Sequence, residues 1–177
     1  DHLSGRVYAG DPQVFSGAGQ GDRRGPRARS QVEHSQPLAL REALRDPFGC
    51  APLRDLVAPT DKVAVIFSDI TRATPYHILL PALLDSLKHL PAGNITLFCA
   101  TGTHRPATEK ELDTILGKEI RRKYRVVQND CTEADRYAEL GTTTSGNRVR
   151  LNREMMEHDL RILTGFIEPH FFAGFSA

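Results

Sequence analysis

Three short segments of the 177-residue sequence carry the side chains best suited to chemistry. In the first, Ser68–Pro75, Asp69 and Arg72 are three residues apart, a spacing that can place both groups on one side of a helical turn. The guanidinium of Arg72 could bind both oxygens of a substrate carboxylate or phosphate, and Asp69 could orient Arg72 or a hydroxyl group. A capping aspartate with a structural ion pair fits the same spacing. This segment alone therefore supports a binding role and a structural role equally.

The second segment, Ala100–Pro106, reads ATGTHRP and offers anion-binding groups beside a histidine. The backbone N–H groups and hydroxyls of Thr101, Gly102 and Thr103 could cradle an anion. His104 follows them directly, and an imidazole can exchange protons near neutral pH. A lone loop histidine more often packs or caps the next helix, but Asp69 and Arg72 favour a chemical role here.

The third segment, Gly165–Ser176, places His170 between Glu168 and two phenylalanines. Taken alone, His170 is more typical of a satisfied histidine in a core loop. Two histidines on different loops, however, could act as opposed acid and base on the two faces of one carbon, as racemisation or epimerisation requires. They could equally bind a transition metal. We expect the other histidines at the surface, at positions 2, 34, 77, 89 and 158.

Alternating strands and helices must position these segments. Strand patterns occur at Lys62–Ser68, Asn94–Ala100, Tyr124–Asn129 and Leu160–Thr164. Helical patterns separate them, so the sequence predicts an α/β, Rossmann-like fold with a parallel or mostly parallel sheet and helices on both faces. Because ligands bind outside the carboxyl ends of such strands, the three segments should line one pocket.

Smaller signals refine this outline. A leucine stripe over Leu80–Leu87 predicts a helix, with Pro81 in its first turn because a proline further along would remove a hydrogen bond. Thr108 and Glu111 have the T-x-x-E spacing of a capping box at the start of the next helix. The stretch Gly141–Asn152 should form a turn and a strand, which could add a hairpin to a sheet edge.

Composition divides the chain at about Pro37. Residues 1–36 are rich in Gly, Ser and Arg, and they predict a flexible or irregular segment because they bury too little apolar surface to offset their ordering entropy. Residues 37–177 carry the α/β pattern and open with a short amphipathic helix that should end at the Asp46–Pro47 break.

Overall composition excludes several classes of function. A net charge of +1 and the absence of Trp argue against nucleic acid as a partner. Three widely spaced cysteines without a C-x-x-C pair favour neither disulfides nor a thiolate metal site. No run approaches the roughly 18 apolar residues of a membrane span, and the N-terminus lacks the apolar core of a signal peptide. We therefore expect a cytoplasmic protein that binds a small molecule and no membrane.

Together, SDITRATP, ATGTHRP-x-T-x-x-E and GFIEPHFFAGFS resemble motifs of the nickel-dependent lactate racemase family of 2-hydroxy-acid racemases and epimerases. The resemblance covers about Pro37–Ala177. It implies a Rossmann-like N-terminal domain, with the active site between that domain and a second one. It also implies a nickel pincer nucleotide (pyridinium-3,5-bisthiocarboxylic acid mononucleotide with nickel) as cofactor. The pyridinium of this group accepts a hydride from C2 of the substrate and returns it to either face.

The same resemblance implies a role for each candidate residue. His104 and His170 match the two catalytic histidines, which act as acid and base on the substrate hydroxyl. Arg72 and Asp69 match a D-x-x-R motif, with Arg72 at the substrate carboxylate. The Thr101, Gly102 and Thr103 run matches a contact to the cofactor phosphate. We therefore expect a lactate-like 2-hydroxy acid as substrate.

In the family, a lysine that binds the cofactor covalently and a histidine that ligates nickel follow the third motif, past Ala177. The resemblance thus predicts no metal ligand among these residues, a C-terminal part that is missing, and no racemase activity for the 177 residues alone. Two alternatives stay open. One is a non-catalytic α/β domain that binds a nucleotide or carboxylate. The other is a metal-dependent hydrolase with His104, His170 and Asp69 as ligands.

Overall fold

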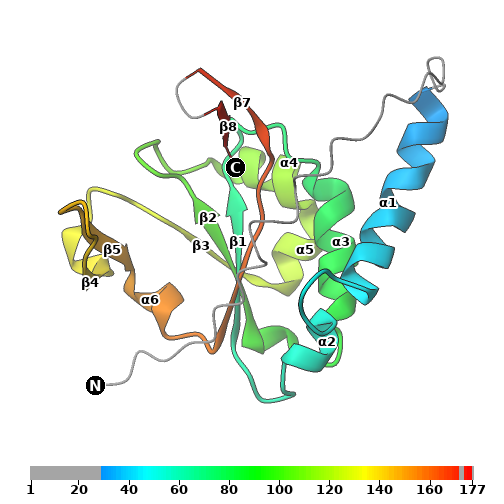
Figure 1. Ribbon diagram of the computed structural model, residues 1–177, viewed down its shortest axis with the longest axis horizontal. Coiled ribbons are helices and arrows are strands. Elements are labelled where there is room, and N and C mark those ends of the chain that lie inside the picture. The colour runs from blue at the N-terminus through cyan, green and yellow to red at the C-terminus, as the bar shows by residue number, and fades with distance from the viewer. Residues whose placement is uncertain (1–28, 172–173, 177) are drawn as a thin grey trace.

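The computed structural model describes residues 29–171 and 174–176, with side chains for all of these except 29–36, 170, 175 and 176. At its centre lies a four-stranded parallel sheet in the order β3-β2-β1-β6 (Figure 1). The strands are β1 (Val63–Ser68), β2 (Ile95–Ala100), β3 (Arg125–Gln128) and β6 (Leu160–Leu163). Each lies within a stretch where the sequence predicts a strand, and the predicted α/β fold with a parallel sheet is confirmed.

Helices cover the two faces of the sheet unequally. One face carries α3 (Tyr76–Ser86), α4 (Glu109–Leu116) and α5 (Lys118–Lys123). On the other face, the described residues form only the short α6 (Arg153–Met156), whose Met155 packs against Ala64 and Phe98. This arrangement follows from the strand order. The β1–β2 and β2–β3 connections run in one direction across the sheet and the β3–β6 connection runs in the other, so right-handed crossovers place them on opposite faces.

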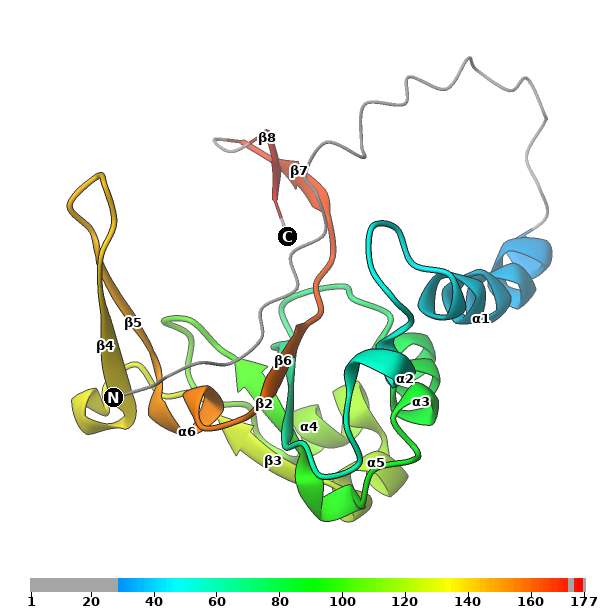
Figure 2. The ribbon, with the colours of Figure 1, turned by 60° about the horizontal axis from the view of Figure 1, so that its bottom comes forward.

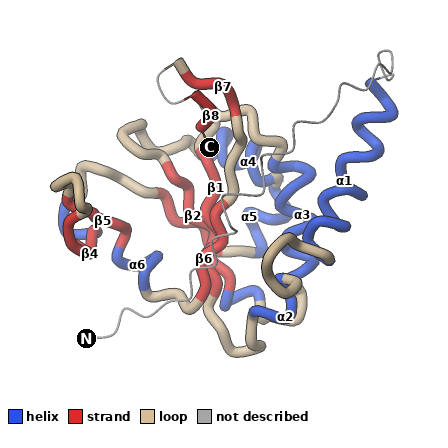
Figure 3. Tube along the Cα trace, viewed as in Figure 1, coloured by secondary structure: helices blue, strands red, loops and turns tan. Residues whose placement is uncertain are grey.

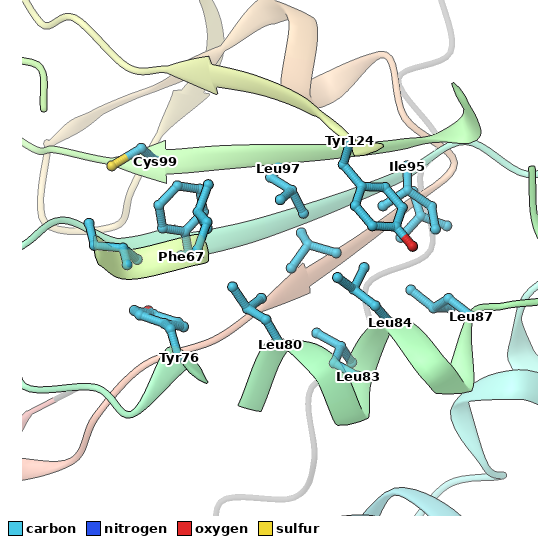
Figure 4. Close-up of a cluster of buried hydrophobic side chains, with 14 of the residues drawn as sticks. Phe67, Tyr76, Leu80, Leu83, Leu84, Leu87, Ile95, Leu97, Cys99 and Tyr124 are labelled. Carbon is cyan, nitrogen blue, oxygen red and sulfur yellow. The ribbon is translucent and has the colours of Figure 1, made fainter. Parts of the chain in front are cut away.

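The main core lies between α3 and the sheet. Leu80, Leu83, Leu84 and Leu87 form the predicted stripe and pack onto residues of β1 and β2 such as Phe67 (Figure 4). Alternate residues of β1 point to opposite faces, as the period of two requires. The packed sheet thereby supports the loops that leave its carboxyl edge.

The prediction that Pro81 lies in the first helical turn is wrong. Helix α3 begins at Tyr76, so Pro81 is inside it. The start is set by tertiary contacts, because the buried Tyr76 hydroxyl accepts a hydrogen bond from Ser68 N at 2.6 Å and its ring meets Phe67 edge-on. The carbonyl that loses a donor to Pro81 belongs to His77, an exposed residue that water can reach.

Helix α1 (Arg29–Arg45) lies against α3 on the side away from the sheet (Figures 1 and 2). An ion pair between Arg41 and Asp85, at 3.2 Å, joins the two helices. The helix begins eight residues before Pro37, so composition placed its start too late: Pro37 is tolerated inside α1. The rest of the segment predicted as irregular, residues 1–28, lies outside the described residues. Helix α2 (Leu53–Leu56) follows α1.

Two hairpins complete the fold. Strands β4 (Tyr137–Thr142) and β5 (Arg148–Asn152) form an antiparallel sheet of their own rather than extending an edge of the main sheet (Figure 3). Strands β7 (Glu168–His170) and β8 (Gly174–Ser176) form the second hairpin, which continues from β6 beyond the carboxyl end of that strand (Figure 2). Two 3-10 turns, η2 (Ala92–Asn94) and η3 (Ala134–Arg136), precede β2 and β4. Among the described helices, none is long and apolar enough to cross a membrane.

Candidate functional site

The three polar segments converge on one pocket of about 350 Å³ at the carboxyl edge of the sheet. Its lining consists of Ser68, Asp69 and Arg72 at and after the end of β1, residues 100–104 at and after the end of β2, and Phe166 and Glu168 after β6. Parallel strands end at one edge, so three loops far apart in sequence meet there. The structure therefore brings together the predicted residues of the first two segments, together with the start of the third.

His104 and Asp69 form a short polar contact in this pocket. The Nδ1 atom of His104 lies 2.6 Å from Oδ2 of Asp69, and the Asp69 side chain is buried whereas that of His104 is half exposed. The other oxygen of Asp69 accepts hydrogen bonds from the backbone N–H of Thr71 at 3.0 Å and from its hydroxyl at 2.6 Å. The carboxylate is thus fixed from both sides and in turn orients the imidazole.

The protonation state of Asp69 suits this task. Burial by itself would raise the pKa of the carboxyl group, but the hydrogen bonds from Thr71 and His104 outweigh burial and hold the pKa below its ordinary value of 3.8. Asp69 is therefore ionised near neutral pH and can accept the Nδ1 proton of His104. In that arrangement Nε2 is the nitrogen available for proton transfer, and it has no hydrogen-bond partner among the described residues.

A tight turn brings His104 to Asp69. The N–H of His104 donates to the carbonyl of Thr101 at 2.9 Å, and Gly102 between them has a φ of 58°, which glycine adopts at little cost. The Thr101 side chain is buried, and its hydroxyl donates to the carbonyl of Asn129 at 2.6 Å. Thr101 therefore anchors the turn to the end of β3.

The far end of the same loop is also held. The side-chain amide of Gln128 in β3 pairs with the backbone of Ala107, accepting from its N–H at 2.6 Å and donating to its carbonyl at 3.0 Å. Thr108 and Glu111 then form the predicted capping box of α4. The loop that carries His104 is thus fixed at both ends before any ligand binds.

The anion cradle expected over Thr101, Gly102 and Thr103 is only partly available. Helix α4 begins at Glu109, so its N-terminus and dipole are separated from this run by a loop, and the capping box already fills that terminus. The hydroxyl proton of Thr101 is committed to Asn129. Gly102 and Thr103 are exposed, and within the described residues their N–H groups have no protein partner. These two residues retain the capacity to bind an anion.

Arg72 pairs with Glu168 rather than with Asp69. Its Nη1 atom donates to Oε1 of Glu168 at 2.7 Å, and its side chain is half exposed. The backbone N–H of Arg72 donates to the carbonyl of Asp69 at 3.2 Å, which closes a turn around Thr71. The Asp69 carboxylate therefore contacts the Thr71 hydroxyl and the His104 imidazole. The Arg72 guanidinium is instead oriented by Glu168, which follows β6.

His170 ends strand β7, where its backbone pairs with Gly174 of β8. Its side chain lies outside the described part of the chain, so its predicted place opposite His104 stays a prediction. No group of three potential metal ligands occurs among the described residues. Cys99 is poorly suited to act as a thiol nucleophile, because burial and then the charge of Asp69 raise its pKa to about 12.

Sequence reasoning missed the partners that fix the site. Glu168 is 96 residues from Arg72 in sequence, and nothing local marks such a pair. Thr71 carries a local signal, because an aspartate two residues before a threonine favours a side-chain turn. The expectation of a surface position for His158 is wrong: it is buried, with Nδ1 2.9 Å from the carbonyl oxygen of Glu154 and its ring edge-on to Phe98.

The sequence of this chain is similar to those of known proteins of one family. Residues 25–177 match the family model described as lactate racemase N-terminal domain. The chain is 35% identical over 158 residues to a lactate racemase of Thermoanaerobacterium thermosaccharolyticum, covering 89% of this chain and 37% of that protein. It is 36% identical over 143 residues to a lactate racemase of Lactiplantibacillus plantarum, covering 80% of this chain and 34% of that protein.

Solved structures agree with this assignment. The lactate racemase apoprotein of T. thermosaccharolyticum superposes with a TM-score of 0.72 and 34% identity, over 79% of this chain and 34% of that one. A protein from Thermotoga maritima, at 20% identity and a TM-score of 0.61 over 81% of this chain and 35% of its own, shares the fold. The chain spans about a third of the length of these relatives. By sequence and by fold, it belongs to the lactate racemase N-terminal domain family.

Proposed function

We propose that this chain supplies the acid–base and carboxylate-binding loops of a racemase or epimerase that acts on a lactate-like 2-hydroxy acid. The observation that carries the proposal is the 2.6 Å contact between His104 and the buried Asp69, in the same pocket as the half-exposed Arg72. A racemase of this class needs one group to hold the carboxylate and another to move the hydroxyl proton. The presence of Arg72 and His104 in this pocket supports these two roles.

Each residue has a defined task in this proposal. Arg72 binds the substrate carboxylate through the donors that Glu168 leaves free, which places the C2 hydroxyl at the pocket. His104, held by Asp69, takes the hydroxyl proton from one enantiomer through Nε2 and returns it in the reverse direction. His170 performs the same step for the other enantiomer. Its position on β7, two residues after Glu168, supports that role.

The residues present fit the phosphate end of a nickel pincer nucleotide. Gly102 and Thr103 are exposed at the pocket, their N–H groups have no partner within the described part of the chain, and the hydroxyl of Thr103 adds a third donor for a phosphate oxygen. When bound, the nucleotide would accept the C2 hydride and return it. The protein would then need to supply orientation and proton transfer only, and these are the tasks for which the described residues are arranged.

The test is to express the complete reading frame together with the machinery that makes the cofactor, and to screen a panel of single-enantiomer 2-hydroxy acids. We expect interconversion of at least one acid, its loss in His104→Ala and Arg72→Ala, and its retention in His77→Ala, a control at an exposed histidine of α3. Inactivity of the wild-type protein across the panel despite bound nickel would contradict the proposal. The 177 residues alone are expected to be inactive.

A further inference from the structure

The contact between Arg72 and Glu168 joins two loops of the pocket that are 96 residues apart in sequence. The Nη1–Oε1 distance is 2.7 Å, and the two side chains are 52% and 34% exposed. Among the described residues, Arg41 and Asp85 pair between two helices and Arg150 and Glu139 pair on the β4–β5 hairpin, whereas both members of the Arg72–Glu168 pair line the pocket. A pair in that position can act on a ligand directly.

Glu168 occupies one corner of the guanidinium and leaves the remainder open. Within the described residues, the side chain of Arg72 makes no other hydrogen bond, so Nε and Nη2 have no partner. Those two atoms form one edge of the planar fork, which matches the two oxygens of a single carboxylate. A carboxylate that holds Nη1 therefore restricts the rotation of a long, half-exposed side chain and turns its free edge to a ligand.

Glu168 also sets the charge of the pocket. The lining contains two carboxylates, Asp69 and Glu168, against one guanidinium. A ligand with one carboxylate can use the free edge of Arg72. A ligand with a second carboxylate must place it in a pocket that already has more carboxylates than guanidinium groups and would be repelled.

We infer that Glu168 is a positioning and selectivity residue: it aims the free edge of Arg72 at the substrate, and its charge favours a 2-hydroxy acid with one carboxylate over a dicarboxylic one. This inference rests on the proposed function, in which Arg72 binds the substrate carboxylate. Two substitutions distinguish the positioning effect of Glu168 from the effect of its charge. Glutamine at this position keeps an oxygen that can accept from Nη1 but removes the charge, whereas alanine removes both.

The experiment compares the wild type with Glu168→Gln and Glu168→Ala in the complete, cofactor-loaded protein. Rates of interconversion are measured for lactate, with one carboxylate, and malate, with two. For Glu168→Ala we expect the KM for lactate to rise about tenfold, equivalent to about 1.4 kcal/mol, with kcat changed by less than about threefold. For Glu168→Gln we expect a nearly unchanged KM for lactate and a several-fold gain in kcat/KM for malate relative to lactate. Asp85→Asn, which breaks a remote ion pair with Arg41, should change neither ratio.

Calorimetric titration of lactate and malate into the same four proteins provides a second readout that needs no turnover. If the wild type binds lactate but interconverts no 2-hydroxy acid, the proposed function fails while the binding differences still test the role of Glu168. Unchanged lactate binding and KM in Glu168→Ala, or an unchanged malate-to-lactate ratio in Glu168→Gln, would overturn the inference. A fall in kcat alone, at constant KM, would also overturn it.

Discussion

Replacing Asp69 with asparagine tests the link between the buried carboxylate and His104. Asparagine has nearly the same shape, and its amide oxygen can still accept the two hydrogen bonds from Thr71. The amide nitrogen would then face Nδ1 of His104, where the carboxylate now lies at 2.6 Å. Two donors would oppose each other unless the imidazole changes tautomer, which would remove the free lone pair from Nε2. The expected result is a misoriented or wrongly protonated base within an intact fold.

The size of the effect follows from the contact. A hydrogen bond to a charged group contributes about 1.5–3 kcal/mol, and about 1.36 kcal/mol corresponds to a tenfold change in rate. If that interaction supports His104 in the transition state, kcat should fall about 10- to 150-fold in Asp69→Asn. Because Asp69 does not contact Arg72 through its side chain, KM for the 2-hydroxy acid should change little.

The chain contains a matched control for this substitution. Asp130 accepts from the backbone N–H of Thr132 at 2.9 Å and from its hydroxyl at 2.7 Å, the same local motif without a histidine. Asp130→Asn should therefore leave enantiomer interconversion unchanged. Chiral chromatography of lactate over time, with circular dichroism to confirm folding, measures both variants. Wild-type kcat in a folded Asp69→Asn protein, or an equal loss in Asp130→Asn, would refute the reasoning.

Three further predictions concern the scaffold. Leu80→Ala should lower the free energy of unfolding in urea by about 2–5 kcal/mol, because Leu80 is fully buried, whereas Leu38→Ala, at a 60% exposed residue, should change it little. Gln128→Ala removes both hydrogen bonds to Ala107 and frees the loop that carries His104, so kcat should fall several-fold; the KM for lactate is measured beside it for comparison. Burial, then Lys62 and nearby arginines, lower the pKa of His158 from 6.5, so below about pH 6.5 the unfolded chain takes up a proton that the fold excludes. The free energy of unfolding should therefore decrease as the pH is lowered through this range, and it should decrease less steeply in a folded His158→Gln protein.

Much of the fold could be predicted from the sequence because its strands are apolar runs that only a sheet covered by helices can bury. The first residue of helix α3 could not be predicted, since the start of the helix depends on the hydrogen bond from Ser68 to Tyr76 rather than on local propensity. The turn and the strand of Gly141–Asn152 could be predicted, but no local signal showed that this strand pairs with β4 in a separate sheet.

The pocket was predictable from one rule, that loops at the carboxyl ends of parallel strands meet. That rule brings Asp69, Arg72 and His104 together but does not assign their partners. The spacing of three residues suggested that Asp69 pairs with Arg72. In the structure, Asp69 contacts His104 and Glu168 pairs with Arg72. Such pairings depend on how far each loop reaches after its strand, a property of the tertiary structure.

The most direct test of the proposed racemase chemistry is the fate of the C2 hydrogen during interconversion in D2O. The complete, cofactor-loaded protein is given one enantiomer of lactate, and the opposite enantiomer is isolated and analysed by mass spectrometry and proton NMR. If a hydride moves away from C2 and returns while His104 and His170 handle only the hydroxyl proton, the product should retain its original hydrogen at C2. Deuterium at C2 of the product would show that a protein base removes the C2 hydrogen as a proton and that a deuteron from the solvent replaces it, which would contradict the proposed roles.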